Sequence, residues 1–307
     1  MRFALIFPLF ALTGVWLLTA ESSTTAAQKS TADLVELVRP AVVQVAVHIT
    51  GPYGRNAAPP PLDRCFRNGT MCVVGTGFFI NAAGDVVTAS HVANGIQGTA
   101  PQPGTQQIMQ MLGANGIHAI TIIGVSIPNV ETSRMLMASG TQFFPATLVA
   151  TDTEHDIAVF HATVNPFTNM PRTFGGPGAA GLPQATAKFV SLALSRPRDG
   201  EEIFACGFPF GEPGLVTTSG TIASAWKTET LPTAAADGFP HSVDVYFADV
   251  RINFGNSGGP VFRSLDQAVL GMVIGFEGNL GIVVPAKYVS EFLTARGIQW
   301  EPATHIH

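Results

Sequence analysis

Short apolar runs rich in β-branched and aromatic residues recur along the chain, and they predict a body made mostly of strands. Residues 41–49 alternate in part between valine and other side chains, which is typical of a strand. Further strands are predicted at residues 73–80, 85–88, 148–150, 157–160, 202–207, 216–225, 243–250, 260–262, 269–276 and 281–284. Turn-forming residues separate them, since the chain has 32 glycines and 22 prolines. We therefore expect an all-β fold.

Two short helices are predicted at the ends of this body. Residues 33–39 carry apolar side chains at helical spacing behind an acidic start, and Pro40 ends the run. Pro285 suits the first turn of a second helix. Residues 286–296 continue that helix, and Gly297 is the expected stop.

A stretch rich in glycine and proline and poor in charge, residues 166–187, divides the predicted strands into two groups. We expect a first barrel over residues 33–165, a second barrel with the closing helix over residues 188–300, and a cleft between them. Residues 94–145 form a long insertion in the first half. This insertion carries a candidate strand at residues 119–127, and a lid, an oligomer contact or an additional hairpin would each fit it.

Residues 1–20 have the form of a secretory signal, because Arg2 precedes an apolar run that ends in small residues. The run contains Pro8 and Gly14 and is only marginally long enough to cross a bilayer, so an uncleaved anchor is the alternative. Residues 21–32 are small and polar and are predicted to be a linker. The body is therefore expected to be periplasmic or secreted, and to touch a membrane only if the N-terminal segment stays uncleaved.

The charge content bears on possible partners, and the three cysteines bear on possible disulfides. Only 12% of residues are charged and the net charge is −5, so no basic footprint for nucleic acid is expected. Cys65 and Cys72 lie seven positions apart and could close a small loop in an oxidising compartment, with two free thiols as the alternative. Cys206 lies in an apolar run and is expected to be a buried thiol.

One serine lies in a run of glycines that could support catalysis. Residues 254–262 read Phe-Gly-Asn-Ser-Gly-Gly-Pro-Val-Phe, with the serine at position 257. Glycine accepts backbone angles that other residues avoid, so this run can form a tight loop that presents Ser257 to solvent. The amides of Gly255 and Ser257 could then point to one place, as an oxyanion hole requires. A glycine-rich turn that leads into a strand is the simpler alternative.

A serine hydroxyl is a weak nucleophile that needs a base, and the base needs an acid that orients it. His91 ends a Thr-Ala-Ser-His run behind an apolar strand, and Asp156 begins an alternating strand. The order is His, Asp, Ser, with separations of 156 − 91 = 65 and 257 − 156 = 101 residues. Asp152 competes with Asp156 for the role of the acid. A core histidine and a surface carboxylate are the non-catalytic alternatives.

In this order and setting, the sequence resembles the trypsin-like serine peptidases, and among them the HtrA/DegP-like branch. Its most specific motifs lie at residues 88–92, 152–159, 207–211, 219–222 and 253–261, and the resemblance covers roughly residues 34–290. It implies two six-stranded antiparallel barrels of the chymotrypsin type. It also implies a catalytic triad of His91, Asp156 and Ser257 that uses no cofactor and no metal.

The same resemblance bears on assembly. Trimers are common in the HtrA branch, so an oligomer is possible. A C-terminal PDZ domain is usual there but is not expected here, because the sequence ends soon after the closing helix. Activation through such a domain is therefore not carried over. Residues 211–214 are instead a candidate loop for switching the oxyanion hole between an active and a resting state.

The family pattern places the first specificity pocket between the residues before Ser257 and a later strand. The candidates for this pocket are Arg251, Ile252, Phe254, Val273, Ile274, Gly275 and Phe276. Of these, Arg251, Phe254, Ile274 and Phe276 are the residues expected to bind substrate. Their mostly apolar character favours a small or medium aliphatic side chain at the cleaved position. An inward Arg251 would favour an acidic side chain instead, and a surface arginine is the alternative.

These features together predict an exported serine endopeptidase that cleaves protein or peptide substrates through an acyl-enzyme. Protein quality control is a role that the resemblance suggests. No motif has metal-ligand spacing, and no cofactor is required. A barrel that hydrolyses poorly and acts as a binding or chaperone-like module is the alternative from another class. A protease that cleaves only itself or one partner is a third.

Overall fold

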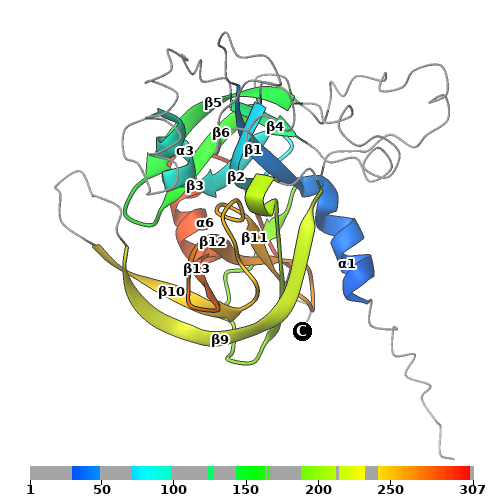
Figure 1. Ribbon diagram of the computed structural model, residues 1–307, viewed down its shortest axis with the longest axis vertical. Coiled ribbons are helices and arrows are strands. Elements are labelled where there is room, and N and C mark those ends of the chain that lie inside the picture. Colours follow the sequence, from blue (N-terminus) through cyan, green and yellow to red (C-terminus); the bar gives the residue numbers. More distant parts are fainter. Residues whose placement is uncertain are drawn as a thin grey trace, which may run out of the picture.

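Two antiparallel β-barrels, one above the other in Figure 1, make up the protein. The computed structural model describes residues 30–48, 71–97, 123–126, 143–162, 165, 167, 188–211, 214–231 and 241–304. The predicted all-β fold with two barrels is confirmed.

The first barrel is a closed ring of six strands in the order β1-β2-β3-β6-β5-β4. These strands are β1 (Val42–His48), β2 (Met71–Phe79), β3 (Asp85–Ala89), β4 (Ile123–Ser126), β5 (Phe143–Asp152) and β6 (Ile157–Ala162). Strand β4 lies in the predicted insertion and closes the ring, because it pairs with both β1 and β5. Part of the insertion therefore belongs to the barrel itself, and most of its remaining residues lie outside the described ones.

The second barrel also closes through six strands, in the order β11-β8-β9-β10-β13-β12, because β11 and β12 pair with each other. The strands are β8 (Glu202–Gly207), β9 (Val216–Leu231), β10 (His241–Asp249), β11 (Pro260–Arg263), β12 (Val269–Glu277) and β13 (Leu280–Pro285). Two further strands, β7 (Ser191–Leu192) and β14 (Glu301–Pro302), pair in parallel beside β12. These two were not predicted, since two residues show no alternation.

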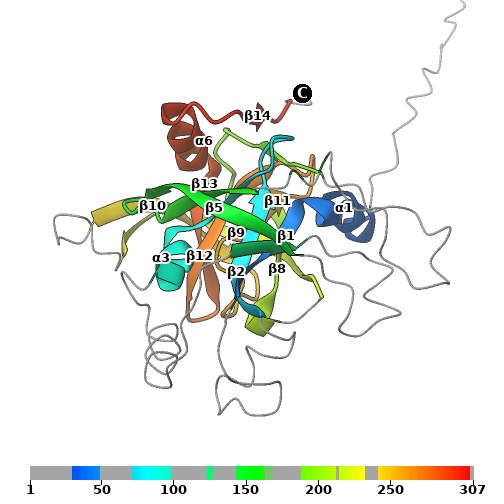
Figure 2. The ribbon, with the colours of Figure 1, turned by 90° about the horizontal axis from the view of Figure 1, so that it is seen from above.

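Short helices lie on different sides of the barrels (Figure 2). The first, α1 (Thr31–Val38), begins two residues before the predicted start because Ser30 and Asp33 form a capping box. The last, α6 (Ala286–Ala295), follows β13 as predicted. Helix α3 (Ser90–Gln97) was not predicted, and it places His91 on a helical turn rather than at the end of a hairpin. Two 3₁₀ turns, η1 (Arg39–Ala41) and η2 (Pro209–Gly211), complete the described elements.

The largest hydrophobic cluster among the described residues includes side chains of both barrels, and two smaller clusters lie in the second barrel. Phe78 and Phe160 from the first barrel belong to the same buried cluster as Phe208, Met272 and Leu293 from the second half. Burial of apolar area is the main favourable term in folding, so separating the barrels would expose much of this cluster. The shared core therefore fixes the two barrels against each other and gives a site between them a rigid frame.

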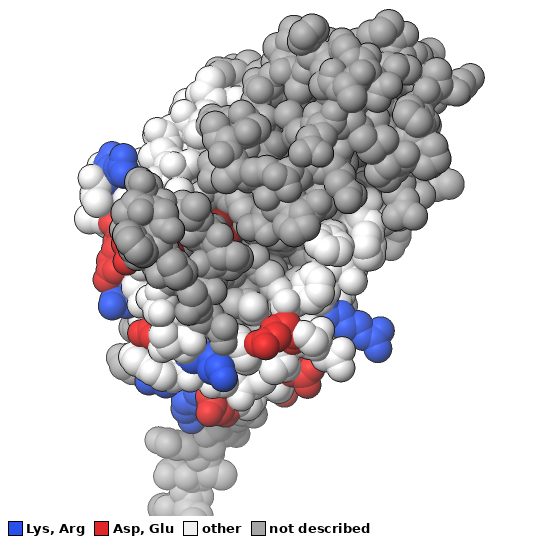
Figure 3. All heavy atoms as spheres, turned by 60° about the vertical axis from the view of Figure 1, so that its left-hand side comes forward, with Lys and Arg blue, Asp and Glu red and all other residues white. Residues whose placement is uncertain are grey.

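Charged side chains are interspersed on the described part of the face shown in Figure 3, where acidic and basic groups lie close together. None of the described helices is long and apolar enough to cross a membrane. Residues 1–20 and Cys65 lie outside the described residues, and the side chain of Cys72 is not described, so the signal and the disulfide stay predictions. Cys206 is a buried free thiol, and burial raises its pKa to about 12.

The shared core yields a test of stability. Leu293→Ala should lower the free energy of unfolding by about 2–5 kcal/mol, because it leaves a cavity where a fully buried side chain packs. Leu265 is 70% exposed, so Leu265→Ala should change the value by less than about 0.5 kcal/mol. Urea unfolding of both variants measures the difference, and equal losses would contradict the shared core.

Candidate active site

The loop that carries Ser257 lies between β10 and β11, and its shape depends on two glycines. Gly255 and Gly258 have φ of +97° and +83°, angles that other residues adopt with strain. A Cβ at Gly258 would collide with the carbonyl oxygen of Thr76 and the hydroxyl of Thr88 in the first barrel. A Cβ at Gly255 would collide with the carbonyl oxygen of Phe208 after β8. The loop can therefore approach the first barrel only because position 258 lacks a side chain, and the segment after β8 only because position 255 lacks one.

Hydrogen bonds hold this loop against the first barrel. The amide of Thr76 in β2 donates to the carbonyl oxygen of Ser257 at 2.9 Å. The Thr76 hydroxyl donates to the carbonyl oxygen of Gly255 at 2.6 Å. On the other side, the amide of Gly258 donates to the carbonyl oxygen of Val273 in β12 at 2.8 Å. Ser257 is thus fixed at the boundary between the two barrels.

His91 and Asp156 meet within the first barrel. The ring Nδ1 of His91 lies 2.6 Å from one carboxylate oxygen of Asp156, and the other oxygen accepts the backbone amide of His91 at 2.8 Å. The carbonyl oxygen of Asp156 accepts the amide of Ser90 at 3.0 Å. Asp156 is only 3% exposed and has φ of +57°, which is unusual for a residue with a side chain. Three hydrogen bonds, two of them to the carboxylate, therefore hold Asp156 toward the histidine.

The contact with Asp156 also changes the pKa of His91. Burial of the ring lowers the pKa of His91, but the negative charge of Asp156 and its hydrogen bond raise it by more. The net pKa of His91 therefore lies above its usual value. Because the Nδ1 proton is donated to the carboxylate, the neutral ring keeps the lone pair of Nε2 free to accept a proton.

Ser257 lies next to this pair without bonding to it. A Cβ at Gly75 would lie 2.8 Å from the Val92 methyl groups and 3.1 Å from the carbonyl oxygen of Ser257, so α3 and the serine loop flank the same point of β2. Within the described residues, no hydrogen bond joins the Ser257 hydroxyl to the His91 ring. Such bonds are often long in structures without substrate and tighten when substrate binds.

The backbone amides of Gly255 and Ser257 make no hydrogen bond to a described group of the protein. The carbonyl oxygen of Phe254 accepts the amide of Phe210 at 2.6 Å. Since N–H and C=O point in opposite directions across a trans peptide, the Gly255 amide faces away from Phe210. Neither this amide nor that of Ser257 donates to another group in the described part of the chain. Both of the predicted oxyanion-hole donors are therefore available to a ligand.

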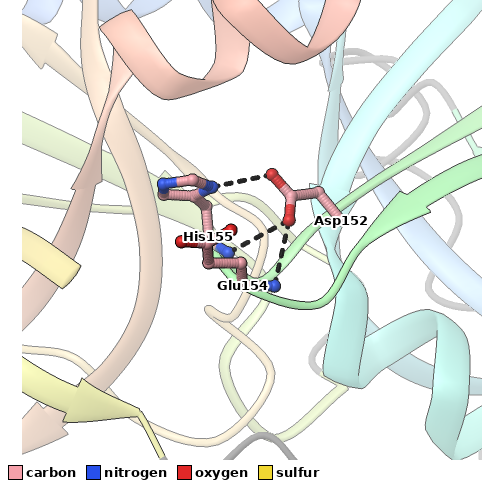
Figure 4. A group of neighbouring side chains, drawn as sticks. All are labelled: Asp152, Glu154 and His155. Carbon is pink, nitrogen blue, oxygen red and sulfur yellow. Dashed lines mark hydrogen bonds and ion pairs between the residues drawn. The ribbon is translucent and has the colours of Figure 1, made fainter. Parts of the chain in front are cut away.

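The competing acid, Asp152, has a different partner. Its carboxylate accepts the amides of Glu154 and His155 and also contacts the His155 ring (Figure 4). The distance from the carboxylate to Nδ1 of that ring is 2.8 Å. Burial raises the pKa of Asp152, but these contacts with His155 lower it by more. The His155 ring also stacks on Tyr288 of α6, with the ring centroids 4.2 Å apart. Asp152 thus braces the turn before Asp156, and Asp156 is the acid that contacts His91.

Among the described residues, Asp152, Glu154 and His155 form a group that could hold a metal ion. One atom each from Asp152, Glu154 and His155 lies within 4.8 Å of the others. Both oxygens of Asp152 and the Nδ1 of His155 already take part in the turn's own hydrogen bonds. We therefore assign the group a bracing role.

The predicted pocket residues divide into three kinds. Phe254 and Phe276 are 69% and 42% exposed and pack edge to face, with their ring centroids 5.7 Å apart. Ile274 is half-buried and packs against the core. Ile252 is partly buried and packs against Gly281, where a Cβ would lie 2.8 Å from the Ile252 Cγ1. The Arg251 side chain is exposed, which agrees with the surface alternative.

The family model of the trypsin-like peptidase domain matches residues 75–272, a stretch that includes His91, Asp156 and Ser257. The chain belongs to this family. Human serine protease HTRA3 is 26% identical over 265 residues, which cover 86% of this chain and 44% of that protein. A DegP-like periplasmic serine endoprotease of Rickettsia prowazekii is 27% identical over 278 residues, which cover 89% of this chain and 46% of that protein. The resemblance to the HtrA/DegP-like branch is thus confirmed, and the chain spans less than half the length of these relatives.

Among solved structures, the active form of the Rv3671c protease from M. tuberculosis matches with a TM-score of 0.54. The two chains are 20% identical, and the match covers 98% of this chain and 97% of the other. An inactive form of the same protease matches with a TM-score of 0.51. At this level of identity the likeness supports the fold.

The pair of His91 and Asp156 generates a prediction about titration. Asp156→Asn should lower the pKa of His91, because burial then acts without the opposing charge. NMR titration of the histidine rings measures this, and an unchanged or higher pKa of His91 would contradict the assigned contact.

The same contact has a consequence for stability. Because the pKa of His91 is higher in the folded state than in the unfolded chain, protonation of His91 stabilises the folded state, and this contribution is complete below the pKa of the unfolded chain. That contribution is lost as the pH rises through the folded-state pKa, so wild type and variant should converge in stability over that range.

Proposed function

We propose that the protein is an exported serine endopeptidase that uses His91, Asp156 and Ser257 as its catalytic triad. The observation that carries the proposal is the 2.6 Å contact between the His91 ring and Asp156, made beside a serine loop that is bonded to the same barrel. The unused Nε2 of His91 and the two open amides of the loop supply the other parts that acyl transfer needs. The family supports the same reaction class.

The first half of the reaction forms the acyl-enzyme. The Ser257 oxygen attacks the carbonyl carbon of the substrate while Nε2 of His91 accepts the hydroxyl proton. The amides of Gly255 and Ser257 donate to the negative oxygen of the tetrahedral intermediate. The carbon–nitrogen bond then breaks, and the protonated His91 gives its proton to the leaving amine. Asp156 stabilises the charged ring during these steps.

The second half releases the product by the same route. A water molecule gives a proton to His91 and attacks the acyl carbon, and the ester bond to Ser257 breaks. His91 returns the proton to the serine oxygen. Apart from the substrate and this water, the reaction uses only groups of the chain, and each proton transfer passes through the His91 imidazole.

Small or medium aliphatic side chains are the proposed preference at the cleaved position. Ile252 packs against Gly281 and the core of the second barrel, which supports an apolar wall for the pocket. Arg251 is exposed, so an acidic side chain gains no buried cation there. Export follows from the form of residues 1–20, and the name of the DegP-like relative, a periplasmic endoprotease, agrees with it. A role in protein quality control is the corresponding biological proposal.

A poorly hydrolysing barrel that binds unfolded chains is the second candidate. It is favoured by the lack of a hydrogen bond between Ser257 and His91 within the described residues. The exposed pair of Phe254 and Phe276 would then serve as an apolar contact surface. The two candidates differ in whether Ser257 reacts.

A fluorophosphonate probe tests this difference. The wild-type protein should be labelled at Ser257, and His91→Ala should lose the labelling and at least about 10⁴-fold of the turnover of unfolded casein. His161 gives a matched control, because it also contacts an aspartate, Asp85, at 2.8 Å but at the opposite end of β3 and β6. His161→Ala should keep the labelling. A folded wild-type sample that stays unlabelled would refute the endopeptidase and favour the binder.

The pocket wall can be tested separately. Ile252→Ala should shift the preference at the cleaved position toward larger side chains, because it removes three carbon atoms beside Gly281. A change of one methylene group in an apolar pocket alters kcat/KM by roughly 10–200-fold. A peptide series with Ala, Val, Leu, Phe and Asp at the cleaved position measures the shift. An unchanged preference, or wild-type cleavage fastest after Asp, would contradict the assigned wall.

A further inference from the structure

Thr76 is a fully buried polar residue in the apolar strand β2, and it lies outside the sequence motifs described above. Its amide donates to the carbonyl oxygen of Ser257 at 2.9 Å. Its own carbonyl oxygen accepts the Thr88 hydroxyl at 2.6 Å, from the strand that leads to His91. Thr76 therefore connects the part of the chain that carries the histidine with the loop that carries the serine.

The direction of the hydroxyl hydrogen bonds is fixed by chemistry. The amide of Phe208 lies 3.0 Å from the Thr76 hydroxyl oxygen, and an amide can only donate. The single hydroxyl proton is then free to go to the carbonyl oxygen of Gly255, 2.6 Å away. Thr76 thus bridges the segment after β8 to the serine loop.

These bonds fix the peptides on both sides of an oxyanion-hole donor. Thr76 holds the carbonyl oxygen of Gly255 before that donor and the carbonyl oxygen of Ser257 after it. The carbonyl oxygen of Asn256, between them, accepts the amide of Gly259 at 2.8 Å. With all three carbonyl groups held, the Ser257 amide has its direction set.

The second donor is tied to the same residue through the segment after β8. Phe208, whose amide is bonded to Thr76, is followed two positions later by Phe210, whose amide binds the carbonyl oxygen of Phe254. That bond orients the Gly255 amide. Phe210 has φ of +56°, so this segment is held in a conformation that an unrestrained phenylalanine avoids.

We propose that Thr76 is a positioning residue that holds the oxyanion hole in its open form from the opposite barrel. The inference rests on the proposed function, since it assigns the geometry of the same site. Thr76 acts through Gly255 and Ser257 and does not touch the substrate. Its hydroxyl is the essential part, because a methyl group needs about 3.5 Å from an oxygen where the hydroxyl bonds at 2.6 Å. Replacing the hydroxyl would push the loop away, and donors of an oxyanion hole work only over a narrow range of distances.

The test compares Thr76→Val, which keeps the shape and loses the hydroxyl, with Thr76→Ser, which keeps the hydroxyl. Thr76→Val should lower kcat by about 10²–10³-fold, as expected when a donor of an oxyanion hole is lost, and should change KM only a few-fold. Its fluorophosphonate labelling should slow to a similar degree. Thr76→Ser should stay within several-fold of wild type. The acid limb of the pH profile should not move, because His91 and Asp156 keep their contact.

A matched control comes from α6. The Thr294 hydroxyl donates to the carbonyl oxygen of Ser290 at 2.7 Å and accepts the indole N–H of Trp300 at 3.0 Å, the same pattern as at Thr76. Thr294→Val should keep the wild-type kcat whatever it costs in thermal stability. If Thr76→Val does not fold, Thr76→Ala removes the hydroxyl without placing a methyl group against the loop. It should still lower kcat, because the carbonyl oxygen of Gly255 and the amide of Phe208 lose their partner.

The outcomes separate the inference from the function on which it rests. A wild-type protein with neither labelling nor turnover refutes the endopeptidase, and the positioning role with it. An active wild type with an equally active Thr76→Val or Thr76→Ala refutes only the positioning role. So does a Thr76→Ser variant as slow as Thr76→Val, or a shifted acid limb, since either would show that the hydroxyl bond to the loop is not what matters.

Discussion

The close approach of two backbones, the serine loop and β2, is the constraint on which the site depends. A side chain at Gly258 would occupy the space of first-barrel atoms, and one at Gly255 would occupy the space of the main chain after β8. With those side chains absent, Thr76 can bond to the loop through its amide and its hydroxyl. The shared hydrophobic core then supplies the free energy that keeps these polar contacts in register. Catalytic geometry and inter-barrel packing are therefore one property of the fold.

The first barrel contains several contacts between histidine and aspartate, and they show what distinguishes a reactive one. His155 and His161 each contact an aspartate through Nδ1, as His91 does. Only His91 faces a serine loop from the other barrel, and its partner Asp156 is nearly fully buried and bonded to the His91 amide as well. A contact with aspartate alone only orients a histidine ring. The position of His91 at the boundary between the barrels also places its ring beside the loop that carries Ser257.

Much of the fold could be predicted because each barrel strand is long enough to show alternation or an apolar run. The two-residue strands β7 and β14 could not, since their pairing arises only after the barrels have formed. The triad residues stand in local motifs, so their spacing along the chain was informative. Thr76 was not recognisable, because its partner Gly255 lies 179 positions away and a threonine in an apolar strand looks like an ordinary β-former.

The left-handed backbone of Asp156 has a consequence for how this protein could change over generations. Glycine or asparagine would adopt φ of +57° more easily than aspartate, so a replacement there would relieve the main chain. A glycine there would also remove the carboxylate that bonds to the ring and the amide of His91, so relief of the main chain would be set against two lost hydrogen bonds. A lineage that keeps aspartate in this turn therefore accepts local strain in exchange for an oriented histidine.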